Sequence, residues 1–312
     1  AIYFTNTWNV QPWLVLSQGL RYTYTGLDAH FNDKTFFPFL QDEVQQRHHA
    51  LSGNLGAVLL PGNGWRFSVL GATGFRAPNV DDLSKVFDSS PGNVIVPNPE
   101  LGPEYTYNLE ISAAKTIADR LHLEVTGYRT WFRNAIAVRP FNLNGQDSIV
   151  YNGEQSQVTA NVNADKAYLY GYSATLQADV TSYLSLSSSL NYTYGRVHAD
   201  AGQVPLDHVP PLFGRTSANL QLKRLRAEFF ILYNGEKSLE DYSPSGEDNL
   251  NYATAAGMPA WYTLNLRTAY QISPNLQLQA AMENITDRYY RVFASGISAP
   301  GRNVVLTLRG KF

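Results

Sequence analysis

The sequence has no cysteine and little charge, and these two absences exclude several classes of protein. Without cysteine, the chain has neither disulfide bonds nor thiolate chemistry. Charged residues make up 16% of the 312 residues, against roughly 25% in an ordinary soluble domain. A formal net charge of −2 gives no basic surface of the kind that binds nucleic acids. The six histidines lack the spacing of a structural zinc site, so we expect no metal ion and no cofactor.

Long hydrophobic runs are also absent. The longest strongly apolar stretch is FFILY, residues 229–233, whereas a membrane helix needs about 18 consecutive apolar residues. The mean hydropathy of −0.26 is typical of soluble proteins. A membrane β-barrel escapes this test, because each of its strands presents only every second residue to lipid. The missing runs therefore exclude helical membrane proteins and leave barrels open.

Strict alternation of apolar and polar residues dominates the sequence. In YLSLSSSLNYTY, residues 183–194, leucine and tyrosine occupy one face, while serine, asparagine and threonine occupy the other. The same period of two recurs in NLQLQAAME (275–283) and in YLYGYSATLQADV (168–180). Helical periodicity is almost absent. Because successive side chains of a β-strand point to opposite faces, the pattern predicts an all-β protein.

Aromatic residues are abundant, at 13% of the chain, and they gather near the expected strand ends. Examples are Tyr22, Trp131, Tyr170, Tyr194 and Tyr289. One interpretation is ordinary core packing in a soluble β-sandwich. The faces opposite these rings, however, carry serine, threonine, glutamine and asparagine rather than an apolar core. We therefore favour an aromatic girdle at a membrane interface, where a ring with one polar end is stable.

The pattern gives about thirteen strands, joined by short turns that alternate with long loops. Several strands run about 12 to 15 residues, whereas soluble strands average about 5 to 6 and a tilted membrane strand needs roughly 9 to 11. Alternating short and long connections are typical of outer-membrane barrels, whose short turns are periplasmic. We predict a transmembrane antiparallel β-barrel. The strands are expected near residues 2–10, 12–26, 48–60, 64–75, 104–117, 120–134, 164–180, 183–197, 212–223, 226–235, 260–273, 275–288 and 302–312.

The odd number of strands carries a further expectation. Single-chain bacterial barrels have an even number of strands. An odd number of strands is therefore expected to precede Ala1. Within the third long loop, Asn144-Gly145 predicts a hairpin with a tight turn, because both positions favour positive φ.

Two boxes in residues 71–110 give the chain its most specific resemblance. One reads GFRAPN and ends an expected strand, and the other reads PNPELGPE and opens the next. Together with YGYSATL (170–176), GMPAWYTLNL (257–266) and NITDRYY (284–290), they resemble the TonB-dependent outer-membrane receptors. The box residues are Phe75, Arg76, Ala77, Pro78, Asn98, Pro99, Leu101 and Glu104.

This resemblance covers essentially the whole chain and implies a multi-pass barrel of 22 strands in the bacterial outer membrane. Residues 1–312 would form one partial barrel domain, corresponding to strands 10 to 22. The family also has an N-terminal plug inside the barrel and a TonB-binding box, neither of which is in this sequence. The implied partners are the TonB energising complex, acting through the plug, the barrel-assembly machinery and the lipid bilayer.

The resemblance implies an active transporter rather than an enzyme, with a small-molecule substrate bound by the outer loops. No catalytic constellation is apparent. Asp81 and Asp82 are interpreted as a solvated pair at a helix start. They are also possible substrate-loop residues, as are His30, His198 and His208, which fall in or beside other outer loops. The expected substrate is an iron complex such as a ferric siderophore. The alternatives are haem, which a missing histidine in residues 79–97 disfavours, cobalamin, or a passive porin.

The C-terminal strand, VVLTLRGKF, generates the first testable prediction. Val304, Leu306 and Leu308 are expected to face lipid, and in the family a terminal aromatic such as Phe312 belongs to the signal read by the assembly machinery. Deleting Phe312 should lower the amount of assembled receptor in purified outer membranes without changing substrate affinity. Normal assembly of the truncated protein would contradict this role.

Overall fold

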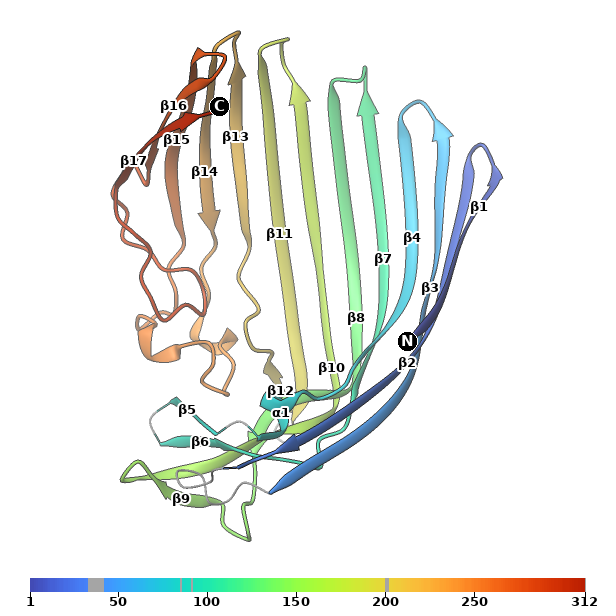
Figure 1. Ribbon diagram of the computed structural model, residues 1–312, viewed down its shortest axis with the longest axis vertical. Helices are drawn as coiled ribbons and strands as arrows, with labels where there is room; N and C mark the ends of the chain where they lie inside the picture. The colour runs from blue at the N-terminus through green and yellow to red at the C-terminus, as the bar shows by residue number, and fades with distance from the viewer. Residues whose placement is uncertain (33–41, 85, 91, 200–201, 312) are drawn as a thin grey trace.

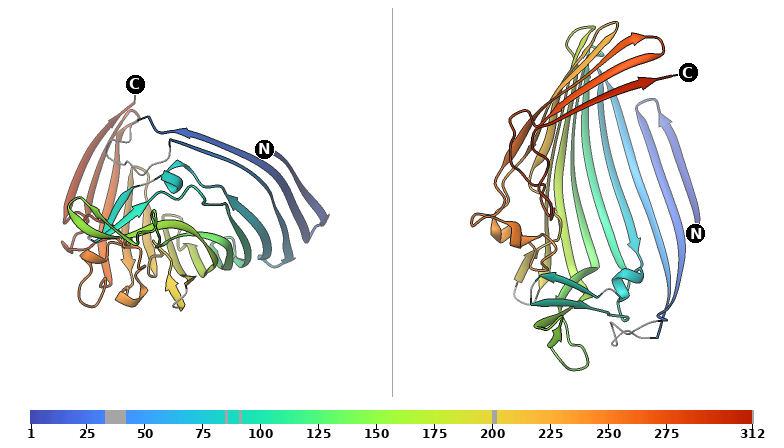
Figure 2. Two further views of the ribbon diagram at one scale, coloured as in Figure 1. Left: turned by 90° about the horizontal axis from the view of Figure 1, so that it is seen from below. Right: turned by 60° about the vertical axis from the view of Figure 1, so that its left-hand side comes forward.

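The computed structural model describes residues 1–32, 42–84, 86–90, 92–199 and 202–311. Within these residues the chain forms one large curved β-sheet of 17 strands (Figure 1). The sheet wraps around a hollow, with the N-terminal and C-terminal strands at its two edges (Figure 2). No helix in this described part of the chain is long and apolar enough to cross a membrane.

The wall of the sheet consists of long strands, each paired antiparallel with the next wall strand along the chain. Four of the 17 strands lie in the loops, which leaves 17 − 4 = 13 described wall strands and confirms the predicted barrel meander. The wall strands are β1 (Ile2–Gln11), β2 (Leu14–His30), β3 (Glu43–Gly62), β4 (Trp65–Arg76), β7 (Glu104–Ile117), β8 (Leu121–Pro140), β10 (Glu154–Asp179), β11 (Leu184–Ala199), β13 (Phe213–Gln221), β14 (Leu225–Asn234), β15 (Trp261–Ser273), β16 (Leu276–Glu283) and β17 (Asn303–Gly310).

The connections differ sharply at the two ends of the wall. Tight turns join the strands at one end, the top of Figure 1, and long loops join them at the other. The long loops contain secondary structure that the alternation pattern did not predict, including β6, which pairs parallel with β10. These loop elements are α1 (Val80–Ser84), β5 (Phe87–Ser90), β6 (Asn93–Val96), β9 (Ser148–Tyr151), β12 (Gly202–Pro205) and the 3₁₀ turns η1 (Leu239–Asp241) and η2 (Leu250–Tyr252).

The predicted tight hairpin in the third long loop is confirmed. Asn144 and Gly145 have φ angles of 52° and 84°, and Leu143 pairs antiparallel with Gln146 on either side of them. Two successive residues with positive φ give a turn whose twist matches that of the flanking chain segments. The conformation of this turn therefore follows from its local sequence.

The strand register separates an apolar face from a polar one. One row on the convex face crosses six strands through Leu186, Ala218, Phe229, Leu266, Met282 and Val304. The row beside it, on the concave face, consists of Ser185, Asn219, Glu228, Arg267, Ala281 and Val305. The convex row exposes large apolar side chains, as a lipid-facing surface requires.

Aromatic rings gather on the convex face near the long loops. Tyr170 lies opposite Tyr194 with ring centroids 5.2 Å apart, and Tyr172 lies opposite Tyr192 at 5.4 Å. The guanidinium carbon of Arg129 lies 5.2 Å from the Trp131 ring. The two tyrosine pairs are cross-strand contacts, and the Arg129–Trp131 contact lies along β8. Rings that combine a large apolar area with polar tips therefore lie where the girdle is predicted.

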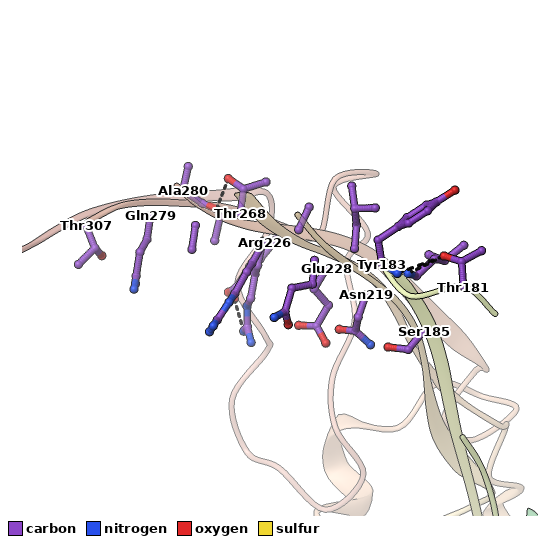
Figure 3. Close-up of a pocket in the computed structure, with 18 of the residues that line it drawn as sticks. Thr181, Tyr183, Ser185, Asn219, Arg226, Glu228, Thr268, Gln279, Ala280 and Thr307 are labelled. Atoms are coloured by element: carbon purple, nitrogen blue, oxygen red, sulfur yellow. Dashed lines mark hydrogen bonds and ion pairs between the residues drawn. The ribbon is translucent and has the colours of Figure 1, made fainter. Parts of the chain in front are cut away.

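The concave face carries polar side chains that surround a cavity of about 750 Å³ near the tight turns. Figure 3 shows Ser185, Asn219, Arg226 and Glu228 pointing toward this hollow, whereas Thr268 and Ala280 point away from it. Two ion pairs lie on the same face, Arg215–Glu228 and Arg267–Glu283, each with an N–O distance of 2.6 Å. Phe230 is buried beneath both arginines.

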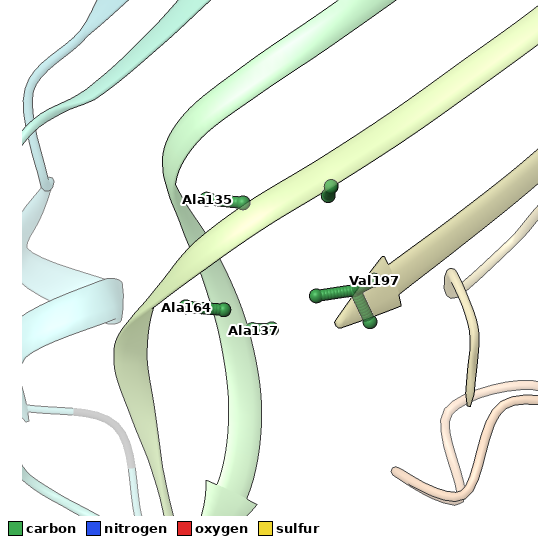
Figure 4. Packing of buried hydrophobic residues seen from close by; sticks show 5 residues of the cluster. Ala135, Ala137, Ala164 and Val197 are labelled. Atoms are coloured by element: carbon green, nitrogen blue, oxygen red, sulfur yellow. The ribbon is translucent and has the colours of Figure 1, made fainter. Parts of the chain in front are cut away.

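Small residues pack where β8, β10 and β11 leave the wall for the loops. Ala135, Ala137, Ala164, Ala167 and Val197 form a buried cluster at this point (Figure 4). Alanine side chains let neighbouring backbones approach closely while still excluding water. The cluster therefore forms a small apolar core between the wall and the long loops.

Two glycines in adjacent strands generate a stability prediction. A Cβ atom at Gly171 would lie 2.2 Å from the Tyr192 carbonyl oxygen and 2.6 Å from the Tyr128 hydroxyl, whereas one at Gly127 would have no neighbour within 4 Å. Gly171→Ala should therefore destabilise the barrel by about 1–3 kcal/mol through overpacking. Gly127→Ala, the matched control, should leave stability nearly unchanged. Denaturant titration of the full-length protein in detergent would measure both, and equal losses would refute the packing argument.

Candidate functional site

One arginine connects the two sequence boxes at the long-loop end of the wall. Arg76 is the last residue of β4 and lies directly opposite Glu104, the first residue of β7. Its Nε donates to Glu104 Oε1 at 2.7 Å, and its Nη1 donates to Asp82 Oδ2 at 2.7 Å. The Arg76 side chain is 44% exposed, whereas those of Asp82 and Glu104 are 15% and 14% exposed. We call these three residues the Arg76 cluster.

The Arg76 cluster also fixes the short helix α1. The backbone N–H of Asp82 donates to Asn79 Oδ1, and the backbone N–H of Asn79 donates to Asp82 Oδ2. This reciprocal capping satisfies amide groups that a helix start would otherwise leave unpaired. Asp81 and Asp82 occupy the first turn, where carboxylates suit the helix dipole. Glu104 Oε2 accepts a hydrogen bond from the Ile136 amide, which ties β8 to the same cluster.

The second box is anchored by buried contacts to distant strands. The Asn98 side-chain amide donates to the Asn161 carbonyl on β10. Leu101 is only 1% exposed and packs with Val44 and Leu83. Gln46 donates to the carbonyls of Pro99 and Leu101, and the Asn163 side chain exchanges hydrogen bonds with the Gly102 backbone. Sequence analysis did not single out Gln46, Asn161 and Asn163, because polar residues on alternating strands carry no local signal of what they bind.

The remaining box residues have simple environments. The Phe75 ring lies 5.4 Å from the Tyr105 ring, Ala77 is half-buried, and Pro78 is buried. Their environments are those of packing residues.

A cavity of about 240 Å³ lies beside the Arg76 cluster, and we call it the mouth cavity. Arg76, Asp81 and Asp82 line it, and Asp207 and Glu247 reach it from two later loops. Four carboxylates and one guanidinium line the mouth cavity, which gives it an acidic character. The predicted Arg76, Asp81 and Asp82 are therefore brought together with two residues that sequence analysis did not select.

The three predicted loop histidines are not brought together. His208 lies nearest the mouth cavity, with its backbone N–H bonded to Asp248 Oδ1 and its Nε2 3.1 Å from the Glu247 carbonyl. His30 lies 3.7 Å from Glu43, and His198 packs edge-on against Tyr168. The part of the chain that the structure describes contains no group of three or more metal-binding side chains. Phe312, the predicted assembly residue, lies outside the described residues.

A profile described as TonB dependent receptor-like, beta-barrel matches residues 1–285. The chain belongs to this family. Its members are receptors and transporters of the outer membrane of Gram-negative bacteria, which places the convex apolar face in lipid, the tight turns in the periplasm and the long loops outside.

Curated relatives and solved structures agree with this assignment. The iron-regulated outer membrane virulence protein of Vibrio cholerae is 26% identical over 242 residues, which are 76% of this chain and 36% of the relative. A probable hemoglobin and hemoglobin-haptoglobin-binding protein of Haemophilus influenzae is 27% identical over 290 residues, which are 88% of this chain and 28% of the relative.

Among solved structures, the copper transporter OprC superposes with a TM-score of 0.77 at 18% identity, covering 99% of this chain and 47% of that one. The ferric enterobactin receptor PfeA of Pseudomonas aeruginosa superposes with a TM-score of 0.71, also at 18% identity, covering 99% of this chain and 45% of that one. Identities this low show a shared fold. The chain spans less than half the length of each of these proteins.

The Arg76 cluster generates a prediction about the outer loops. Arg76→Met would leave two largely buried carboxylates without their cation, so the loop of residues 77–103 should loosen by about 1–2 kcal/mol, a value reduced because the guanidinium is partly exposed. Hydrogen–deuterium exchange of the full-length receptor should show faster exchange in this loop. Arg66→Met is the control, because Arg66 lies on the same strand and has no recorded polar partner among the described residues. Equal protection in both variants would contradict the anchoring role.

Proposed function

We propose that this chain is the barrel part of an outer-membrane active transporter that takes up a scarce nutrient, an iron complex such as a ferric siderophore. The observation that carries the proposal is the family match over residues 1–285, joined to relatives whose names refer to iron regulation and haemoglobin. Two solved structures with the same fold are a ferric enterobactin receptor and a siderophore receptor.

Two parts of the structure support this proposal: the concave face of the wall and the long loops. The wall strands are joined by continuous antiparallel pairing from β1 to β17, and the concave face carries two ion pairs. Such a surface suits a lumen that holds a polar plug, and we propose that the TonB energising complex acts through that plug. The long loops gather acidic and aromatic residues around the mouth, where a substrate would first be held.

A haem or haemoglobin receptor of the same family is the second candidate. The haemoglobin-binding relative of H. influenzae, at 27% identity, favours it. Against it, residues 79–97 contain no histidine that could ligate haem iron. We therefore place the ferric siderophore first. Cobalamin uptake finds no support in the names of the relatives described above.

An uptake experiment tests the proposed function. The full-length receptor, expressed in a strain without other iron receptors, should restore growth on at least one member of a panel of ferric siderophores. The panel should include haem and cobalamin as alternative substrates. Rescue by haem alone would favour the second candidate, and rescue by none of the three classes would overturn the proposal.

Dependence on TonB separates active transport from a passive porin. In a strain without TonB, an active transporter should lose uptake completely while still binding its substrate on the cell surface. A passive porin would keep its uptake in the same strain. Unchanged uptake without TonB would therefore rule out the proposed mechanism.

A further inference from the structure

Three positively charged residues lie near one another at the long-loop end of the wall, and we call them the rim patch. Arg133 on β8 lies directly opposite Lys166 on β10 in the strand register. Arg129 precedes Arg133 on β8 by four residues. All three residues are exposed. The patch therefore presents three positive charges to the surroundings of the barrel.

The rim patch belongs to the convex face of the wall. The convex row that passes through Leu186 continues through Ala178 on β10 to Leu121 on β8. From Leu121 onward, every second residue of β8 keeps the same face. This face therefore carries, in order, Leu121, Leu123, Val125, Gly127, Arg129, Trp131 and Arg133.

The order of these residues matches the profile of one side of a membrane. Leu123 and Val125 are 37% and 54% exposed, as lipid-facing side chains are. The distance along the strand from Leu121 to Arg133 is about 40 Å, which a strand tilt of about 40° reduces to a height of roughly 30 Å. The apolar band of such barrels is only about 25 Å tall. Arg133 and Lys166 therefore lie beyond the apolar band, at the level of the lipid headgroups on the long-loop side.

Arg129 is held among the aromatic rings next to the other two cations. Its guanidinium carbon lies 5.2 Å from the centre of the Trp131 ring and 5.6 Å from that of the Tyr168 ring. Trp131 and Tyr168 face each other in the register, between the level of Arg129 and the Arg133–Lys166 pair. A guanidinium that stacks on aromatic rings keeps its N–H groups available for an anion.

The described side chains supply no negative charge to the rim patch. Neither an ion pair nor a side-chain hydrogen bond is recorded for Arg129, Arg133 or Lys166 within the described part of the chain. The residues of β7 that lie opposite Arg133 and Arg129 are Tyr105 and Leu109. Like charges directly opposite each other destabilise a pair of strands. An anion that bridges Arg133 and Lys166 would remove this repulsion.

We propose that the rim patch binds a membrane lipid whose headgroup carries phosphate monoesters, in the leaflet at the long-loop end. A phosphate monoester has three acceptor oxygens and a charge of about −1.5 to −2 at pH 7, which suits neighbouring guanidinium and ammonium groups. A zwitterionic headgroup fits less well, because the patch would repel its ammonium group. The acyl chains of the lipid would lie against Leu123 and Val125.

This inference goes beyond the proposed uptake of a nutrient. It depends on the placement of the convex face in lipid, whereas substrate capture takes place in the loops and the lumen. Lipid binding to the receptor can be measured without transport, so either proposal can fail while the other stands.

Native mass spectrometry of the purified, delipidated full-length receptor in detergent tests the inference, with lipid A, a diphosphorylated glycolipid, as the probe. The matched ligand is lipid A from which both phosphates have been removed. The unaltered receptor should bind lipid A at least about tenfold more tightly than the phosphate-free form, because only lipid A offers charge to the patch. Equal binding of the two forms would overturn the inference.

A double variant connects the binding to the rim patch. Arg133→Gln combined with Lys166→Gln should weaken the binding of one lipid A molecule about tenfold or more, because two charges near the membrane surface are lost. The control is Lys115→Gln combined with Arg120→Gln, which removes two charges at the tight-turn end of the wall. The control should bind lipid A like the unaltered receptor. An unchanged titration of the rim-patch variant would contradict the proposed site.

Inorganic phosphate distinguishes a lipid site from a site for a free anion. At millimolar concentration it should leave lipid A bound, because it offers no acyl chains to the apolar strip. Complete displacement of lipid A by inorganic phosphate would overturn the lipid assignment. Should the double variant fail to assemble, the comparison of lipid A with its phosphate-free form on the unaltered receptor decides.

Discussion

The requirement that buried backbone groups find hydrogen-bond partners governs this structure. Lipid offers neither donors nor acceptors, so each N–H and C=O in the wall must bond to a neighbouring strand. The antiparallel ladders between β1 and β17 meet this requirement over strands of 8 to 26 residues, except along the outer edges of β1 and β17, where the described residues provide no neighbouring strand. Once the ladders are formed, side chains alternate between lipid and lumen with no further choice. The apolar convex row and the largely polar concave row reflect this alternation.

The long-loop end obeys different rules because water is present there. Irregular backbone is tolerated there, and side-chain hydrogen bonds and ion pairs hold the loop backbone in place. The Arg76 cluster holds a helix start against two strands, and Asn98 and Asn163 tie the second box to β10. Lys237, whose pKa is lowered by burial, donates to the Val209 carbonyl and braces a later loop. Each of these loops is therefore held by its own set of side-chain contacts, and all of them extend from the same β-sheet.

The wall could be predicted from sequence and the loop contacts could not. Alternation in stretches such as 183–194 reports which face each residue takes, so the strands and the alternating turns emerged directly. The pairing of β6 with β10 joins Val94 to Val158, and nothing local to either segment encodes it. The members of the Arg76 cluster could be selected from sequence, because Arg76 and Glu104 belong to the two boxes and Asp82 lies between them. Trp261, the first residue of β15, and Arg291, in the last long loop, line one pocket although they are far apart in sequence, which no periodicity reveals.

The spacing of neighbouring strands has a consequence for how such a chain can change. Each long loop leaves one strand and returns on an adjacent wall strand, about 4.8 Å away, so its ends are held together before the loop adopts any structure. Lengthening a loop whose ends are already fixed costs little entropy, about 0.6 kcal/mol for each doubling. The connection between β8 and β10 has used this freedom to build its own hairpin and a strand that extends well beyond the girdle. Ligand specificity can thus be rewritten by insertion while the thermodynamic cost to the barrel stays almost constant.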